Sequence, residues 1–154
     1  MHWIYVQGKG ITSADGEVEL LFDAPRPAIR ALLGFDEKKN KGRSLQEDQY
    51  GKSLENPAHW VRLGFSEKGG LLQEIEVLAG TVEVDGVKIE AYDGDLKKAL
   101  AALKKKGYSF KKGDYSYTDF EHFVDIGESG ANGAEKRYRT AWIFLSRSFD
   151  HLKV

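Results

Sequence analysis

Apolar and polar side chains alternate along much of this chain, which is the pattern of half-buried β-strands. The alternation is clearest over residues 59–65 and 71–78, and the loop between these two segments contains Gly69 and Gly70. The dipeptide Asp85-Gly86 favours a tight hairpin between two further strands. We also predict strands at residues 2–7, 17–22, 115–117, 120–127 and 138–146.

Two segments change to helical spacing of their apolar residues. In the first, Asp23 can cap a helix that begins at Pro25, where a proline loses no needed hydrogen bond. In the second, Asp93 or Asp95 can cap a helix over residues 96–106, whose lysines face outward or lie at its negative C-terminal end. A glycine follows each segment and can end the helix.

The order of these elements suggests an internal repeat, with halves at about residues 11–80 and 81–147. Residues 59–64 and 122–127 match at a histidine, a valine and a glycine, although a match this short could also arise by chance. We predict one domain over residues 1–154, of the α+β class. Its antiparallel strands form one curved sheet or two packed halves, with one main helix per half.

Composition narrows the function more by exclusion than by indication. The 154 residues suit a single globular domain, with 41% hydrophobic and 31% charged side chains. The absence of cysteine excludes disulfides, zinc–thiolate sites and thiol nucleophiles. The 23 basic and 24 acidic residues argue against a general nucleic-acid or membrane binder. Because no signal-peptide pattern or long apolar run is present, we expect a cytoplasmic protein.

The near-neutral total hides strong local polarity. Residues 74–95 are acidic with Lys88 as their one cation, residues 96–113 carry lysines and no acid, and residues 114–128 carry acids and neither lysine nor arginine. One interpretation is solvated faces that neutralise one another in space. The other is an acidic sheet surface backed by a basic helix, which would attract a basic partner.

No catalytic or nucleotide-binding motif is present, and we predict neither a metal nor a cofactor. Asp114, Asp119 and Glu121 are acids that could hold a hard cation, but their series is too sparse for a calcium loop. If the repeat is real, His59 and His122 occupy equivalent strand positions. They are then either an acid–base pair of the kind that cleaves RNA or two half-buried strand histidines hydrogen-bonded to neighbours.

Tyrosines among carboxylates in the second half are typical of a protein-binding surface with a desolvated centre and a charged rim. If one strand runs straight through this region, its odd-numbered residues share a face. Phe120, Val124 and Ile126 would then pack inward, with His122 on their side. The predicted contact residues are Tyr115, Tyr117, Asp119, Glu121 and Asp125.

The least apolar stretch, residues 36–58, is predicted to be a long loop with a short strand near Tyr50. Loops of this length in a compact domain are usually functional or mobile. We therefore expect a second contact with a partner around Asp48 and Tyr50.

The order of elements over roughly residues 17–145 resembles the β-lactamase-inhibitor-protein-like fold. In that fold a helix-plus-sheet unit is duplicated and the concave sheet binds a partner protein, and outer-membrane assembly lipoproteins carry one copy of the unit. The resemblance is one of layout without a diagnostic motif, and this chain departs from the group in having no cysteine. It implies a binding protein rather than an enzyme.

The chain also resembles the immunity proteins of bacterial polymorphic toxins, including those of contact-dependent growth inhibition. The likeness lies in size, in the lack of cysteines and catalytic motifs, and in α+β structure with acidic patches. It is carried by residues 71–78, by the hairpin at Asp85-Gly86 and by the helix with its aspartate cap. It implies a non-catalytic cytoplasmic protein that binds and neutralises one cognate toxin domain, often a basic nuclease, without contacting nucleic acid or membrane itself. The alternative is a small hydrolase or nuclease that uses His59 and His122.

Overall fold

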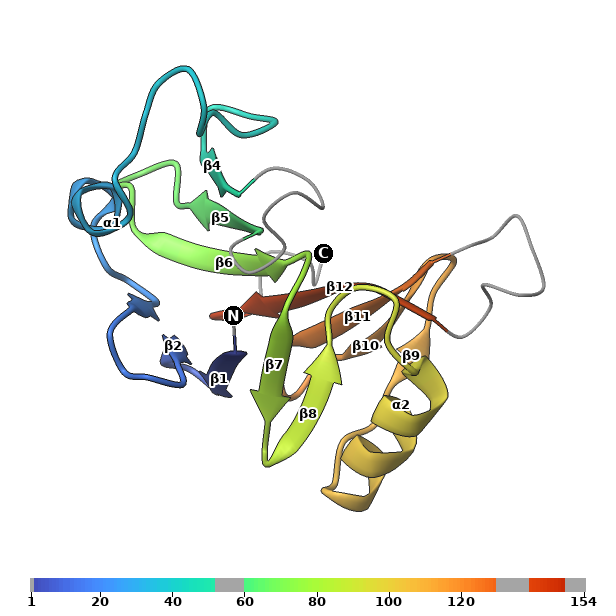
Figure 1. Cartoon of the computed structure of the whole chain (residues 1–154). Helices are drawn as coiled ribbons and strands as arrows, with labels where there is room; N and C mark the ends of the chain where they lie inside the picture. Colours follow the sequence, from blue (N-terminus) through green and yellow to red (C-terminus); the bar gives the residue numbers. More distant parts are fainter. Residues whose placement is uncertain (1, 52–59, 130–138, 149–154) are drawn as a thin grey trace.

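The computed structural model describes residues 2–51, 60–129 and 139–148, which form two β-sheets flanked by two helices (Figure 1). The α+β class is therefore confirmed. The five-stranded sheet has the order β3-β2-β1-β7-β8, with β1 (His2–Val6), β2 (Gly10–Ser13), β3 (Glu19–Leu21), β7 (Thr81–Val84) and β8 (Val87–Glu90). The seven-stranded sheet has the order β4-β5-β6-β12-β11-β10-β9. Its strands are β4 (Glu47–Tyr50), β5 (Val61–Phe65), β6 (Leu72–Val77), β9 (Lys111–Lys112), β10 (Ser116–Asp119), β11 (Val124–Ser129) and β12 (Arg139–Ser146).

The alternation seen in the sequence is the alternation of burial in the strands. In β5 the odd-numbered residues are buried, and in β1 Trp3 and Tyr5 are buried between half-exposed neighbours. Inward side chains of both sheets belong to one hydrophobic cluster. Each fully buried aliphatic side chain in such a core contributes about 1.5–3 kcal/mol to stability relative to an exposed one.

The helices α1 (Arg26–Leu33) and α2 (Leu96–Lys105) lie at opposite ends of the molecule, on the left and right of Figure 1. Asp95 caps α2, because its carboxylate accepts the backbone N–H of Lys98 at 3.0 Å. The predicted cap of α1 is wrong. Pro25 is the N-cap residue, and Asp23 adopts a left-handed backbone (φ 69°) and pairs with Gln73 and Arg147 instead.

The two halves of the chain follow the same order of elements. In the first half β2, β3, α1, β4, β5 and β6 follow one another, and in the second half β7, β8, α2, β10, β11 and β12 do so, with β9 as an addition. The strand order of both sheets is approximately symmetric. In the seven-stranded sheet β6 and β12 are neighbours, and in the five-stranded sheet β1 lies between the hairpins β2–β3 and β7–β8.

The correspondence extends to single residues. Asp93 also has a left-handed backbone, and its N–H donates to the carbonyl of Thr140 at 2.8 Å, as the N–H of Asp23 donates to that of Leu72 at 2.8 Å. A register shift follows Gly64 in β5 and Gly127 in β11, so the ends of the two matching sequence blocks occupy equivalent positions in these strands. Duplication as the origin of the halves stays a prediction.

Candidate functional site

The predicted acidic site does not lie on one straight strand. β10 ends at Asp119, the chain turns through residues 120–123, and β11 returns beside β10. Asp119 pairs with Val124 and Tyr117 with Ile126, and directly paired residues of an antiparallel ladder point to the same side. The expectation that odd-numbered residues face outward throughout is therefore wrong, because the turn reverses the parity. Tyr117 packs partly buried against the core.

Asp119 is only 1% exposed and holds this turn together. Its carboxylate accepts the backbone N–H groups of Ser109 at 2.8 Å, Glu121 at 2.9 Å and His122 at 2.8 Å. Burial alone would raise the pKa of Asp119, but the hydrogen bonds from these backbone groups and from the His122 ring lower it. Asp119 is thus a buried turn residue and not part of an exposed contact surface.

His122 lies in the turn itself, so the prediction that it occupies a strand position is wrong. Its Nδ1 is 2.9 Å from Oδ2 of Asp119, and its ring stacks on Tyr108 with the centroids 3.9 Å apart. The side chain is 25% exposed, in keeping with a half-buried histidine hydrogen-bonded to a neighbour. Because His59 lies outside the described residues, the expected pairing of the two histidines stays a prediction.

Asp48 and Tyr50, the predicted second contact, are buried as well. They occupy the inward positions of β4 and are 0% and 6% exposed. Both oxygens of Asp48 accept hydrogen bonds from Arg26 and Arg30 of α1. Burial would raise the pKa of Asp48, but the arginine hydrogen bonds outweigh burial and lower it. These two side chains therefore organise the interior and are not available to a partner in this conformation.

Of the predicted contacts, Tyr115 and Glu121 are exposed and Asp125 is half-buried. Asp125 points away from the core, to the outer face of the seven-stranded sheet. There it accepts the hydroxyl of Thr118 at 2.6 Å and the indole N–H of Trp142 at 3.3 Å. Asp125 thereby fixes the orientation of Trp142.

The indole of Trp142 lies directly over Gly127, its partner in the β11–β12 ladder. A Cβ at position 127 would lie 2.1 Å from Cδ2 of Trp142, so only glycine lets the ring approach the strand this closely. The hydrogen bond to Asp125 and the contact with Gly127 together hold the half-buried ring in one place.

We use "outer face" for the residues of this sheet that point away from the core. They are Glu47, Gln49, Arg62, Gly64, Glu74, Glu76, Lys111, Ser116, Thr118, Asp125, Gly127, Trp142, Phe144 and Ser146. On its β4–β6 side, Glu76 pairs with Arg62 at 3.0 Å and with Arg43 at 3.5 Å. Arg43 also pairs with Glu47 at 2.9 Å. The outer face thus combines aromatic side chains with the carboxylates of Glu47, Glu74, Glu76 and Asp125 and with the cations of Arg62 and Lys111.

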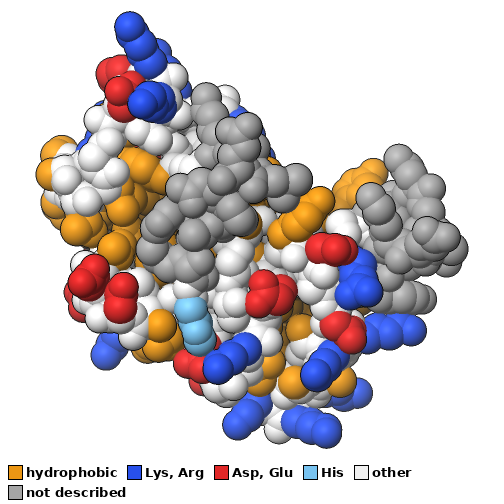
Figure 2. Space-filling model, in the orientation of Figure 1, with side chains coloured by type: hydrophobic (Ala, Val, Ile, Leu, Met, Phe, Trp, Pro, Cys, Tyr) orange, Lys and Arg blue, Asp and Glu red, His pale blue; other side chains and the backbone are white. Residues whose placement is uncertain are grey.

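The basic helix expected behind the acidic strands is present. The lysines of α2 and of the residue after it are exposed, and Figure 2 shows basic side chains gathered on the α2 side of the molecule. The surface of α2 is therefore basic, whereas the outer face carries acidic and basic side chains together.

Sequence reasoning missed two groups of residues. Trp142 and Phe144 alternate with the buried Ile143 and Leu145, so β12 is apolar on both sides. This continuous apolar run is the sequence signal that could have indicated a covered outer face. Arg26 and Arg30 stand four residues apart on one helix, a spacing that puts both on the same side. Only the fold shows that Asp48 lies opposite them.

No family model matches the chain, and neither a curated protein nor a solved structure matches it. Within the described residues, no helix is long and apolar enough to cross a membrane. In the same part of the chain, no group of three or more histidine and acidic side chains is placed to hold a metal ion.

Proposed function

We propose that this protein is an immunity protein that binds and neutralises a cognate bacterial toxin domain in the cytoplasm. The contact surface in this proposal is the outer face of the seven-stranded sheet. The observation that carries the proposal is Trp142, a tryptophan held over Gly127 by the carboxylate of Asp125 in the middle strands of that sheet. Tryptophan is among the residues that contribute most to protein–protein binding, above all when its orientation is fixed before binding.

The charges of the outer face fit a basic partner. Four carboxylates stand there, from Glu47, Glu74, Glu76 and Asp125, against the cations of Arg62, Arg43 and Lys111. An acidic surface speeds the capture of a basic nuclease domain and disfavours acidic partners. Of the predicted contact residues, the proposal retains Asp125, with Tyr115 and Glu121 at the periphery. It replaces the buried contact residues with Trp142.

The test takes a toxin domain that a neighbouring gene encodes, expresses it in bacteria with and without this protein, and measures binding of the purified pair by calorimetry; the absence of such a gene would count against the proposal. The unchanged protein should restore growth, and Trp142→Ala should weaken binding at least about tenfold, the loss typical of an interface tryptophan. Leu21→Ala, which removes an exposed apolar side chain from the other sheet, is the matched control and should bind normally. Equal binding by both variants would refute the placement on the outer face. Failure of the unchanged protein to restore growth would refute the function.

A second function, cleavage of nucleic acid, is favoured by one contact. The Asp119–His122 pair has the geometry of a base oriented by a buried carboxylate. This reading predicts that purified protein cleaves RNA or DNA and that His122→Ala abolishes the cleavage. The binding proposal predicts no cleavage by either form.

A further inference from the structure

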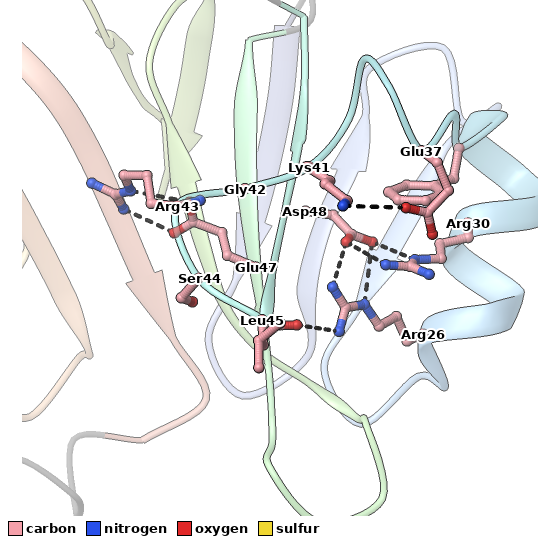
Figure 3. A pocket seen from close by; sticks show the side chains of 11 residues that line it. Arg26, Arg30, Glu37, Lys41, Gly42, Arg43, Ser44, Leu45, Glu47 and Asp48 are labelled. Atoms are coloured by element: carbon pink, nitrogen blue, oxygen red, sulfur yellow. Dashed lines mark hydrogen bonds and ion pairs between the residues drawn. The ribbon is translucent and has the colours of Figure 1, made fainter.

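Two arginines converge on one buried carboxylate at the seam between α1 and β4 (Figure 3). Nη2 of Arg26 lies 2.5 Å from Oδ1 of Asp48, and Nη1 of Arg26 donates to the carbonyl of Leu45 at 2.8 Å. Arg30 donates to Asp48 from Nε at 2.9 Å and from Nη2 at 2.8 Å. Two cations therefore share one anion, and the group carries a surplus positive charge.

Arg30 keeps hydrogen-bonding capacity that Asp48 does not use. A guanidinium has five N–H donors, and Nη1 of Arg30 makes no hydrogen bond within the described part of the chain. The guanidinium also lies 3.7 Å from the centre of the Phe35 ring, which fixes its plane. The edge formed by Nη1 and Nη2 is therefore oriented and can receive the two oxygens of a second oxyanion.

This cluster lines a cavity of about 570 Å³, large enough for a small organic molecule. Of its other charged side chains, Glu37 lies 3.8 Å from Lys41 and, next to the larger effect of Asp48, also helps to raise the pKa of Arg30, and Arg43 lies 2.9 Å from Glu47. Once these pairs are formed, Arg26 and Arg30 against Asp48 leave one net positive charge in the cavity. An anion is the complementary ligand.

The second half of the chain shows what this position looks like without the cluster. The N-cap residues Pro25 and Asp95 form equivalent bridges to Leu71 and Arg139, which aligns the two helices. In β4, Asp48 pairs with Leu63, the residue before Gly64. In β10, Tyr117 pairs with Ile126, the residue before Gly127, so β4 and β10 are aligned as well. The three equivalents of Arg26, Arg30 and Asp48 are then Leu96, Leu100 and Tyr117, which pack into or against the core.

The same architecture is therefore built with apolar packing in one half and with a charged cluster and a cavity in the other. Replacing a buried ion-pair cluster by well-packed apolar side chains is often neutral or stabilising, so stability alone does not account for the charged version. We propose that the α1–β4 cavity binds a small oxyanion, a carboxylate or phosphate group, at the free edge of Arg30. The proposed anion site does not rest on the proposed toxin binding, although Glu47 and Arg43 line the cavity and also lie at the border of the outer face.

The test is an NMR titration of the full chain with inorganic phosphate and, separately, with succinate, each compared with sodium chloride at equal ionic strength. We expect saturable shifts of the Arg30 side-chain Nε–H and of the amides of Phe35 and Lys41. The anion that binds more tightly assigns the site to phosphate or to carboxylate.

Three variants make the result specific. Arg30→Leu copies Leu100 of the other half and should abolish the saturable shifts. Arg30→Lys keeps the positive charge but removes the paired N–H donors of the guanidinium, and it should weaken anion binding at least about tenfold. Arg147→Lys, a matched change in the arginine that pairs with Asp23, should leave anion binding unchanged. The proposal is overturned if neither anion acts beyond sodium chloride, or if Arg30→Leu or Arg30→Lys titrates like the unchanged protein.

Discussion

Asp48→Asn tests whether the charged cluster at the α1–β4 seam is desolvated. Asp48 is fully buried and accepts four hydrogen bonds from Arg26 and Arg30, whose side chains are 21% and 31% exposed. Removing one partner of a buried ion pair costs about 3–5 kcal/mol, because the charges left behind are uncompensated. Water can reach part of both arginines, so we expect a loss of about 2–4 kcal/mol in the free energy of unfolding.

The assay is reversible urea and thermal unfolding followed by circular dichroism at neutral pH. For a domain of this length, the expected loss corresponds to a fall of about 5–15 °C in Tm. Asp23→Asn is the matched control, because Asp23 pairs with Arg147 at 2.7 Å with both side chains nearly half exposed. Such a pair contributes about 0–1 kcal/mol. If Asp48→Asn were as mild as Asp23→Asn, the cluster would be solvated and the reasoning from burial would fail.

Two further outcomes follow from the structure. Gly127→Ala should displace Trp142, alter the near-ultraviolet circular dichroism and lower the free energy of unfolding by about 1–3 kcal/mol. Gly64→Ala would bring a Cβ to 3.1 Å from the flexible side chain of Glu74 and should lower that free energy less. Equal losses would contradict the placement of the indole. Because the pKa of Asp119 is lowered on folding, its contribution to stability is present above the pKa of about 3.9 for an unfolded aspartate and is lost as the pH falls below it. Tm should therefore hold between about pH 7 and 5 and drop below about pH 4, and Asp119→Asn should flatten that drop in the same thermal scans.

The sequence predicted most strands because their alternation reports burial directly, but it could not place the turn after β10. Residues 120–123 contain neither glycine nor proline, and Phe123 adopts a left-handed backbone (φ 59°) without a residue type that favours one. The turn is held by the carboxylate of Asp119 instead. The sequence alone therefore favours one continuous strand, and this prediction assigned part of the site to the wrong face of the sheet.

Burial of charged residues was equally hidden. In the sequence, Asp48 stands in a polar stretch and reads as part of an exposed loop. Its burial depends on two arginines that lie on α1, some twenty residues earlier in the chain. Pairing across such a separation is a property of the fold and leaves no periodic signal.

The two halves of the molecule agree where they build the scaffold and differ where we place binding. At inward positions the equivalents are alike: Val61 and Val124, Leu63 and Ile126, Ile75 and Ile143; the register shift also follows a glycine in each half, Gly64 or Gly127. On the outer face, carboxylates in one half stand where aromatics stand in the other: Glu74 and Trp142, Glu76 and Phe144. Between helix and strand, the first half has the charged side chains of Arg26, Arg30 and Asp48 where the second half has Leu96, Leu100 and Tyr117. Because both versions fit the same backbone arrangement, packing does not require these differences, and the acidic–aromatic face and the arginine cavity are the parts of the chain that folding leaves free to serve recognition.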